Sequence, residues 1–368
     1  MNVLQVNKFY YPVVGGIEHV VQNIAEGLPN QYQMRILAAR PKGLGGSERY
    51  NSVDVKKTSS LGVAISVPLT PTFPLQLRAE ARNADIVHHH LPNPLSTVSQ
   101  LTAGTGDSTV IATYHSDIVR QAAALKVYRP VLDRFLDRVD RILVTSERLL
   151  DQSAILEPYE NKCSIVPLSV DLDAIDAENP PELDIDTTGP VVLFVGRLNY
   201  YKGIEYLVDA MEEIEATLLV AGDGERRSAL KQRARERGVD DQIQFLGYVS
   251  DTKLASAYRA ADLFVLPSVE PSEAFGIVQL EAMARGLPVV NTSLPTGVPW
   301  VSQDGETGLT VPPRDATALA DAVNVLLEED ERRHRYGEQA RKRVERLFTR
   351  EKMIGNIQTI YDETAGEG

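Results

Sequence analysis

The chain has 368 residues, 43% of them hydrophobic and 24% charged, which is ordinary for a globular protein and long enough for two domains with separate cores. Its formal net charge of −13 argues against nucleic acid as a general partner. Residues 1–172 carry 17 basic and 16 acidic side chains, whereas residues 173–368 carry 21 and 35. Only the first part of the chain therefore suits an anionic membrane surface.

Targeting signals are weak. No apolar run approaches the roughly 18 residues that cross a bilayer, and the first residues, Met-Asn-Val-Leu-Gln-Val, lack the basic and apolar regions of a signal peptide. A single cysteine, Cys163, allows no internal disulfide and favours a reducing compartment. We expect a cytoplasmic protein, with the inner face of the membrane as its candidate contact surface.

The chain opens with an apolar strand over residues 3–6, a loop that ends in Gly15-Gly16, and a helical pattern over residues 17–25. The paired glycines would let a ligand approach the backbone at the carboxyl end of the strand. A tight turn without a ligand is the alternative. The loop is not a GxGxxG sequence, so we do not expect a dinucleotide site.

Further strands are predicted at residues 34–39, 85–89, 109–114, 142–145 and 164–167, with helical patterns between several of them. This alternation predicts a parallel sheet. The run His88-His89-His90 is a poor metal chelate, because neighbouring residues of a strand point to opposite faces. His115 closes the strand at 109–114, where a side chain can face a ligand; a structural histidine is the alternative.

A basic amphipathic pattern follows. Leu125, Tyr128, Leu132, Phe135 and Val139 recur at helical spacing. The basic residues between them are Arg120, Lys126, Arg129, Arg134 and Arg138. Such a helix can rest on a membrane or meet an anionic lipid-linked acceptor; a core-facing helix with a solvated basic side is equally consistent.

The second half starts like the first, with a strand at residues 191–195 after a proline-containing linker. Gly196 and Arg197 follow the strand and Lys202 comes five residues after the arginine. These two cations could both reach one diphosphate. Two more predicted strands, 216–220 and 243–246, lead into turns at Gly222 and at Gly247-Tyr248-Val249.

The most informative stretch is 271–288, Pro-Ser-Glu-Ala-Phe-Gly-Ile-Val-Gln-Leu-Glu-Ala-Met-Ala-Arg-Gly-Leu-Pro. It indicates a loop with Glu273 and a helix that begins near Gly276-Ile277, after a strand at residues 262–267. The first amides of a helix form a diphosphate site, and carboxylates beside it, Glu273 and Glu281, would hold hydroxyls. That combination points to a sugar nucleotide. For the spacing of the two glutamates alone, an ordinary amphipathic helix is the alternative.

The whole stretch resembles the nucleotide-sugar motif of the retaining glycosyltransferases of family 4, and the resemblance extends over about residues 1–362. It implies an α/β protein with the GT-B fold: two facing Rossmann-like domains, a cleft between them, and a C-terminal helix that crosses back to the first domain. The implied parts are an acceptor-binding domain at 1–172, a linker at 173–190, a nucleotide-sugar domain at 191–348 and the crossing helix at 349–368.

The resemblance also implies roles for individual residues. The catalytic set would be Arg197 and Lys202 on the leaving diphosphate, Glu273 on the sugar hydroxyls and His115 on the sugar from the opposite wall. Glu281 would hold the ribose, and Tyr248-Val249 would present backbone groups to the nucleobase. The remaining donor-binding positions are Gly15, Gly16, Gly196, Gly222, Ala274, Phe275, Gly276 and Ile277.

Two strings, 114–121 and 296–301, look most like bacterial α-mannosyltransferases that act on polyprenyl-diphosphate-linked saccharides. They imply transfer of mannose from GDP-mannose to a saccharide or lipid-linked saccharide in cell-surface polysaccharide synthesis, with retention at the anomeric carbon. The alternatives are a UDP-sugar donor (UDP-glucose or UDP-GlcNAc) with a small-molecule acceptor, and a sugar-nucleotide-binding protein without turnover. We expect no cofactor and no metal. An epimerase and a phosphorylase are less consistent with the chain.

Overall fold

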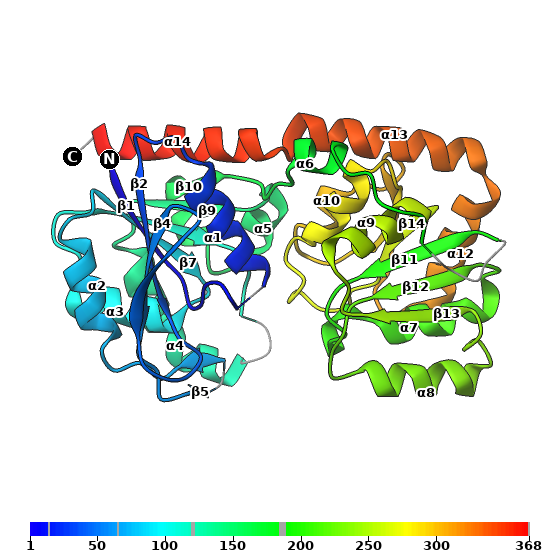
Figure 1. Ribbon diagram of the computed structural model, residues 1–368, viewed down its shortest axis with the longest axis horizontal. Coiled ribbons are helices and arrows are strands. Elements are labelled where there is room, and N and C mark those ends of the chain that lie inside the picture. The colour runs from blue at the N-terminus through cyan, green and yellow to red at the C-terminus, as the bar shows by residue number, and fades with distance from the viewer. Residues whose placement is uncertain (14, 65, 119–121, 184–188, 367–368) are drawn as a thin grey trace. The chain divides into compact units, whose positions relative to one another are not determined.

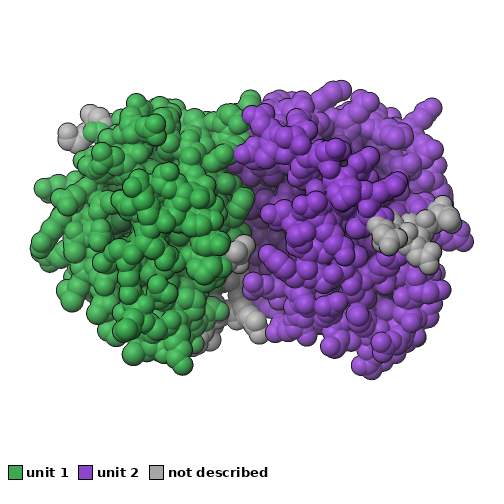
Figure 2. Space-filling view, viewed as in Figure 1, with its two compact units in different colours: residues 1–168, 350–368 green, residues 169–349 purple. Residues whose placement is uncertain are grey.

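The computed structural model describes residues 1–366 apart from 14, 65, 119–121 and 184–188. The chain divides into two compact units. Unit 1 comprises Met1–Leu168 together with Arg350–Gly368, and unit 2 comprises Ser169–Thr349. Figure 2 colours the two units separately.

Unit 1 is built on an eight-stranded sheet in the order β10-β9-β8-β7-β1-β2-β4-β3. All neighbours are parallel except β3 and β4, which form an antiparallel edge. The strands are β1 (Asn2–Val6), β2 (Gln33–Ala39), β3 (Gly46–Tyr50), β4 (Val53–Thr58), β7 (Ile86–Leu91), β8 (Thr109–Tyr114), β9 (Arg141–Val144) and β10 (Cys163–Ile165), with a small hairpin of β5 (Val63–Ala64) and β6 (Val67–Pro68) outside the sheet.

The helices of unit 1 bury their apolar sides against this sheet (Figure 1). They are α1 (Gly16–Gly27), α2 (Phe73–Ala81), α3 (Pro94–Ala103), α4 (Ala122–Leu136), α5 (Glu147–Gln152) and the last helix of the chain, α14 (Arg350–Gly366). Helix α14 contacts α1, and its Tyr361 is fully buried in unit 1. The end of the chain is therefore part of the first unit.

Unit 2 is built on a six-stranded, all-parallel sheet in the order β13-β12-β11-β14-β15-β16. The strands are β11 (Val191–Val195), β12 (Thr217–Ala221), β13 (Ile243–Gly247), β14 (Leu263–Leu266), β15 (Val289–Thr292) and β16 (Gly308–Val311). The helices are α6 (Leu172–Asp176), α7 (Ile204–Ala210), α8 (Arg227–Arg237), α9 (Asp251–Ala260), α10 (Ile277–Ala284), α11 (Val298–Val301), α12 (Ala316–Glu328) and α13 (Asp330–Leu347).

The central strands β11 and β14 are apolar at every position and fully covered, as expected for a parallel sheet with helices on both faces. One continuous cluster of buried side chains packs the helices α7, α8 and α12 onto this sheet. The strand pattern predicted for both halves is thus present. The antiparallel edge β3 was not predicted, because its sequence, Gly-Ser-Glu-Arg-Tyr, is mostly exposed and lacks apolar alternation.

Candidate active site

The strand order of unit 2 brings two loops together. Strand β11 has β12 on one side and β14 on the other, so the chain winds in opposite directions from this point. In an open parallel sheet, ligands bind outside the carboxyl ends of the strands at such a switch point. The loop after β11 contains Arg197 and Lys202, and the loop after β14 contains Glu273.

Lys202 and Glu273 meet in a buried ion pair. The Lys202 Nζ lies 2.5 Å from Glu273 Oε2, and both residues are less than one-tenth exposed. Ser268 donates its hydroxyl to the same carboxylate oxygen at 2.9 Å. Burial alone would lower the pKa of Lys202, but the neighbouring Glu273 carboxylate and Tyr201 outweigh it and the pKa lies above its usual value. The lysine is therefore a cation at neutral pH.

The glycine before α10 brings the helix start close to the end of strand β14. Gly276 has φ +72°, and a Cβ there would lie 2.6 Å from Leu266 Cδ2, so a larger residue would push the helix start away from the strand. The first amides of α10 have no acceptor within the helix. Gln279 binds the preceding turn through the Phe275 carbonyl at 2.7 Å. The start of α10, where backbone amides are free to donate, thus lies four residues after Glu273.

Glu281 contacts a different set of side chains from Glu273. Its Oε2 accepts a hydrogen bond from the Tyr258 hydroxyl at 2.9 Å, and the Arg285 guanidinium lies 4.6 Å from the centroid of the Tyr258 ring. Burial raises the pKa of Glu281 above its usual value, although the Tyr258 hydrogen bond and Arg285 oppose this. Glu281 is in the second turn of α10, whereas Glu273 precedes the helix.

Arg197 differs from Lys202 in its surroundings. Its side chain is exposed, and no ion pair forms between it and the described residues. Gly196, just before it, leaves open the space beside the lysine: a Cβ there would lie 3.4 Å from Lys202 Nζ. An unpaired guanidinium next to the pair can engage an anion without first breaking an ion pair.

The ends of β12 and β13 form the next part of the same edge. The Gly222 amide donates to the Gly247 carbonyl at 2.8 Å, and a Cβ on Gly222, which has φ +139°, would lie 2.0 Å from the Gly196 carbonyl oxygen. Only glycine fits where these loops touch. Beyond them Tyr248 is 86% exposed and Val249 is half-buried.

Two of the predicted donor contacts can involve the backbone only. The Phe275 side chain is 3% exposed and packs against Trp300 and Phe348, so only its main chain could reach a ligand. The carbonyl of Ala274 accepts from the Gly297 amide at 2.8 Å. Ile277, by contrast, is half-buried at the first position of α10.

Unit 1 has its own switch point, between β1 and β7. The loop after β1 contains Gly15, the residue before α1, and Gly16, its first residue. Val14 beside them lies outside the described residues. The paired glycines are therefore at the carboxyl end of β1 and at a helix start.

His115 follows β8, the strand next to β7, and is 6% exposed. Its Nε2 lies 3.0 Å from His90 Nδ1, and burial lowers the pKa of His115 to about 3. His115 is therefore a neutral imidazole. Of the string that follows it, residues 119–121 lie outside the described part of the chain.

The apolar side of the basic helix α4 was expected to face either a membrane or the core, and in the structure it faces the core. Leu132, Phe135 and Leu136 are buried in the core of unit 1, and so is Val139 just after α4. The apolar side described in the structure is thus not free for a membrane. Lys126 and Arg134 are exposed on the other side; Arg120 and the side chain of Leu125 lie outside the described residues.

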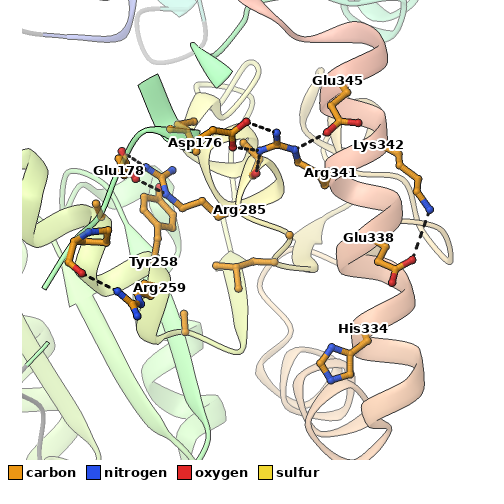
Figure 3. A pocket seen from close by; sticks show the side chains of 17 residues that line it. Asp176, Glu178, Tyr258, Arg259, Arg285, His334, Glu338, Arg341, Lys342 and Glu345 are labelled. Atoms are coloured by element: carbon orange, nitrogen blue, oxygen red, sulfur yellow. Dashed lines mark hydrogen bonds and ion pairs between the residues drawn. The ribbon is translucent and has the colours of Figure 1, made fainter. Parts of the chain in front are cut away.

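A cavity of unit 2, drawn in Figure 3, has neither Lys202 nor Glu273 among the residues that line it. It has a volume of about 930 Å³ and is bounded by residues 175–180, α9, the end of α10 and α13. Two of its arginines are paired with carboxylates: Arg285 with Glu178 at 2.6 Å and Arg341 with Asp176 at 2.8 Å. These pairs hold the segment after α6 on unit 2 rather than leaving charges for a ligand.

Three residues of the site were not predicted from sequence. Ser268 contacts Glu273, Tyr258 contacts Glu281 and His90 contacts His115. Ser268 lies just past a strand end that was predicted, so its position was a usable signal; the other two contacts come from tertiary packing. Among the described residues no group of His, Cys, Asp and Glu side chains is arranged to hold a metal ion.

Solved structures with this fold identify the class. The chain is similar to sucrose-phosphate synthase from Thermosynechococcus elongatus, with a TM-score of 0.82, 23% identity and complete coverage of both chains. It is also similar to Anabaena Alr3699/HepE in complex with UDP-glucose, with a TM-score of 0.77 and 17% identity over 99% of this chain and 100% of that one. The protein therefore has the GT-B fold, with two Rossmann-like α/β domains.

Sequence comparisons give the family. The model for glycosyl transferases group 1 matches residues 176–343 and that for glycosyltransferase family 4 matches residues 14–174. O-antigen chain mannosyltransferase C of Escherichia coli is 30% identical over 98% of both chains. D-rhamnosyltransferase WbpZ of Pseudomonas aeruginosa is 32% identical over 95% of this chain and 92% of the relative. The phosphatidyl-myo-inositol mannosyltransferase of Mycobacterium leprae is 28% identical over 100% and 98%.

The chain belongs to this family of GT-B glycosyltransferases, and it is a hexosyltransferase. The expected fold class, family and reaction class are confirmed. No helix in the described residues is long and apolar enough to span a membrane.

Proposed function

We propose that this protein is a retaining mannosyltransferase that moves mannose from GDP-mannose to a hydroxyl of a polyprenyl-diphosphate-linked saccharide in cell-surface polysaccharide synthesis. The observation that carries the donor site is the buried Lys202–Glu273 pair, whose glutamate comes four residues before the start of α10. The choice of mannose rests on two relatives, aligned over nearly their whole length, that are named mannosyltransferases.

Different site residues bind different parts of the donor. Lys202 and Arg197 neutralise the diphosphate as the bond from the anomeric carbon to the phosphate oxygen breaks and its electron pair leaves with GDP. The amides of Gly276 and Ile277 bind the same phosphate oxygens. Glu273, with one carboxylate oxygen already held by Lys202 and Ser268, orients the sugar through the other.

Glu281 binds the ribose hydroxyls through the oxygen that Tyr258 does not occupy. Backbone groups of Tyr248 and Val249, at the end of β13, contact the base. Gly15, Gly16 and His115 contribute from unit 1: the glycine loop contacts the phosphate, and the neutral His115 contacts the sugar. No step in this scheme uses a metal ion.

A UDP-sugar donor is the alternative that a comparison favours, because one solved structure of the same fold holds UDP-glucose. Thermal unfolding with GDP, UDP and ADP, each in the presence of magnesium and of EDTA, separates the two. Ligands that bind the folded state raise the melting temperature by mass action. A GDP-selective rise in EDTA supports the proposal, whereas a UDP-selective rise or a strict magnesium requirement contradicts it.

We further propose that unit 1 contacts an anionic membrane surface, on the cytoplasmic side, where a lipid-linked acceptor is found. Several large apolar side chains are exposed on the segments that flank the β5–β6 hairpin and on the helices α2 and α4: Leu61 (75%), Leu69 (47%), Leu75 (71%) and Val127 (79%). Helix α3 packs against α2, α4 and β6, so these elements are neighbours. We call these four residues the apolar surface.

The charges around the apolar surface suit anionic lipid. Residues 55–79 and 118–132 contain no Asp or Glu, and Arg78 and Lys126 are exposed there. Basic residues near an anionic membrane contribute about 1 kcal/mol each. Exposed leucines supply the apolar contact that charge alone lacks.

Co-sedimentation with vesicles tests this contact. The protein should pellet with phosphatidylglycerol vesicles and not with phosphatidylcholine vesicles. Leu61→Ser with Leu75→Ser, or Lys126→Glu alone, should release it. The matched control is Lys253→Glu, a charge reversal at an exposed lysine of α9 in unit 2. Equal binding by the double variant and the unmodified protein would contradict the proposed surface.

A further inference from the structure

The run of three histidines in β7 is divided between the two faces of the unit 1 sheet. His89 faces helices α3 and α4, where its Nε2 lies 3.2 Å from Gln100 Oε1 and its ring packs edge-on against Phe135. His88 and His90 face the other way, and their rings stack at 4.7 Å. The proposed mechanism uses none of the three.

His88 and His90 belong to a series of hydrogen-bonded side chains that links His115 to the last helix, α14. His115 Nε2 lies 3.0 Å from His90 Nδ1, and His90 Nε2 lies 2.6 Å from Gln5 Oε1. The Gln5 amide donates to the Tyr361 hydroxyl at 2.9 Å. That hydroxyl lies 2.6 Å from His88 Nδ1, and His88 Nε2 lies 2.7 Å from Thr113 Oγ1.

The side chains of this hydrogen-bonded series are shielded from water. Gln5, His88, His90 and Tyr361 are fully buried, and burial lowers the pKa of both histidines far below 6.5. The imidazoles are therefore neutral, with one N–H donor and one acceptor nitrogen each. A buried chain of such groups is stable only if every donor meets an acceptor.

The orientation of the Gln5 amide determines which nitrogen of each imidazole ring carries the hydrogen. Its oxygen faces His90 Nε2, so that nitrogen carries the hydrogen and Nδ1 of His90 is an acceptor. His115 must then donate from Nε2 to His90. A neutral His115 that donates from Nε2 has a bare lone pair on Nδ1.

We propose that His90, Gln5 and Tyr361 are positioning residues that hold His115 in the tautomer with a hydrogen on Nε2. His115 then offers Nδ1 as a hydrogen-bond acceptor. An uncharged acceptor binds a sugar hydroxyl but offers nothing to a phosphate oxygen, so the chain directs His115 to the sugar part of the donor. This inference rests on the proposed function of His115.

Two neighbouring residues outside the hydrogen-bonded series serve as matched controls. Tyr32 also bonds α14, through Asp362 at 2.6 Å, and its ring lies 6.1 Å from that of Tyr361, yet it does not contact the histidines. Tyr32→Phe therefore reports the docking of α14 alone. His89→Gln changes the adjacent histidine on the opposite face.

Transfer kinetics give the first test. Tyr361→Phe and His90→Phe should lower kcat/KM about 10-fold to 100-fold, the usual range for a residue that orients a reacting group. GDP affinity should not change, because His115 is assigned to the sugar, which GDP lacks. Tyr32→Phe and His89→Gln should stay within about twofold of the unmodified protein. Equal losses in a test variant and its control would overturn the proposal, and so would unchanged kcat/KM in Tyr361→Phe, which removes one hydroxyl and should fold.

Nitrogen NMR of the histidine-labelled protein tests the tautomer without activity, and with six histidines the signals can be assigned by substitution. His115 should show a protonated Nε2 and an unprotonated Nδ1 at pH 7, and in His90→Phe it should become a mixture of tautomers. A charged His115, or one with its hydrogen on Nδ1, would overturn the inference even if transfer is active. If His115 has the expected tautomer but the protein uses no donor, the proposed function is wrong. The inference that His90, Gln5 and Tyr361 set the tautomer of His115 then still holds.

Discussion

Lys202 Nζ and Glu273 Oε2, which lie 2.5 Å apart, come from loops that follow two different strands on either side of the switch point of unit 2. Without donor, each neutralises the other in a site that is almost closed to water. In the proposed mechanism, Lys202 gains the diphosphate and Glu273 gains the sugar hydroxyls when the donor binds. The pair therefore keeps both groups in place and charged before the substrate arrives.

The first prediction concerns this pair. Lys202→Met and Glu273→Gln should each lower kcat by at least about 100-fold, the usual loss when a group that stabilises developing charge or orients the substrate is removed. Each single variant also leaves one buried charge unpaired, which costs about 3 to 5 kcal/mol of folding free energy. Steady-state kinetics and urea unfolding measure the two effects.

The double variant Lys202→Met with Glu273→Gln separates catalysis from stability. With no unpaired charge left, it should recover most of the lost folding free energy while transfer stays undetectable. Recovery of transfer in the double variant would show that the pair is structural only.

The second prediction concerns Arg197, which is exposed and has no ion pair among the described residues. Arg197→Lys should leave the unfolding free energy within about 0.5 kcal/mol but lower kcat/KM, because a lysine cannot bind two phosphate oxygens at once. Arg237→Lys, an exposed arginine on α8, is the control and should keep full activity. Normal kcat/KM in Arg197→Lys would remove the arginine from the diphosphate site.

The third prediction concerns Glu281 and its proposed ribose contact. Glu281→Ala should weaken GDP binding by roughly 1 to 3 kcal/mol, the usual cost of losing a hydrogen bond to a charged group. It should leave the binding of 2′,3′-dideoxy-GDP unchanged, because that analogue has no ribose hydroxyls to lose. Titration calorimetry measures both. An equal loss for both nucleotides would assign Glu281 a structural role through Tyr258.

The fourth prediction concerns the buried histidines. Burial lowers the pKa of His88 and His115 to about 3, that of His89 to about 4 and that of His90 well below 6.5. Below pH 6.5 the unfolded chain takes up protons that the folded chain does not, so stability is present above pH 6.5 and falls as the pH drops towards 4. Glu281, with its pKa raised by burial, changes the folding stability in the opposite direction as the pH falls. It is a single group, whereas four histidines act together.

Each such histidine contributes a slope of about 1.4 kcal/mol per pH unit in this range. Urea unfolding at pH 6.5, 6.0, 5.5 and 5.0 measures the slope, and His89→Gln should reduce it by the contribution of one histidine. A stability that does not change between pH 6.5 and 5 would mean that the four imidazoles are not buried as described.

The sequence predicted the sheets because both halves repeat short apolar strands that end in glycine turns. The strands at 109–114 and 191–195 were predicted to the residue. The hairpin, the edge strand β3 and its neighbour β4 were not predicted; β3 is mostly exposed and has no apolar period. The boundary of unit 2 falls at Ser169, where nothing in the local composition distinguishes it from the residues that follow.

The site was predictable where a loop residue follows a strand, and less so where a contact depends on packing. Glu273 and Lys202 were candidates because each lies in the loop after a predicted strand, and the structure brings the two side chains together. His90 was not assigned a partner, because its contact with His115 depends on the register of β7 with β8. Helix α4 shows the same limit: its period is that of any amphipathic helix, and only the structure reveals that Leu132 and Phe135 face the core.

The most direct test of the account is transfer itself, followed by proton NMR of the product. The purified protein is incubated in EDTA with GDP-mannose, UDP-glucose or UDP-GlcNAc and a lipid extract that contains polyprenyl-diphosphate-linked saccharides. The account predicts mannose transfer from GDP-mannose alone, with the α configuration of the donor retained. Transfer from a UDP-sugar alone, a β-linked product, or no turnover of any donor would contradict it.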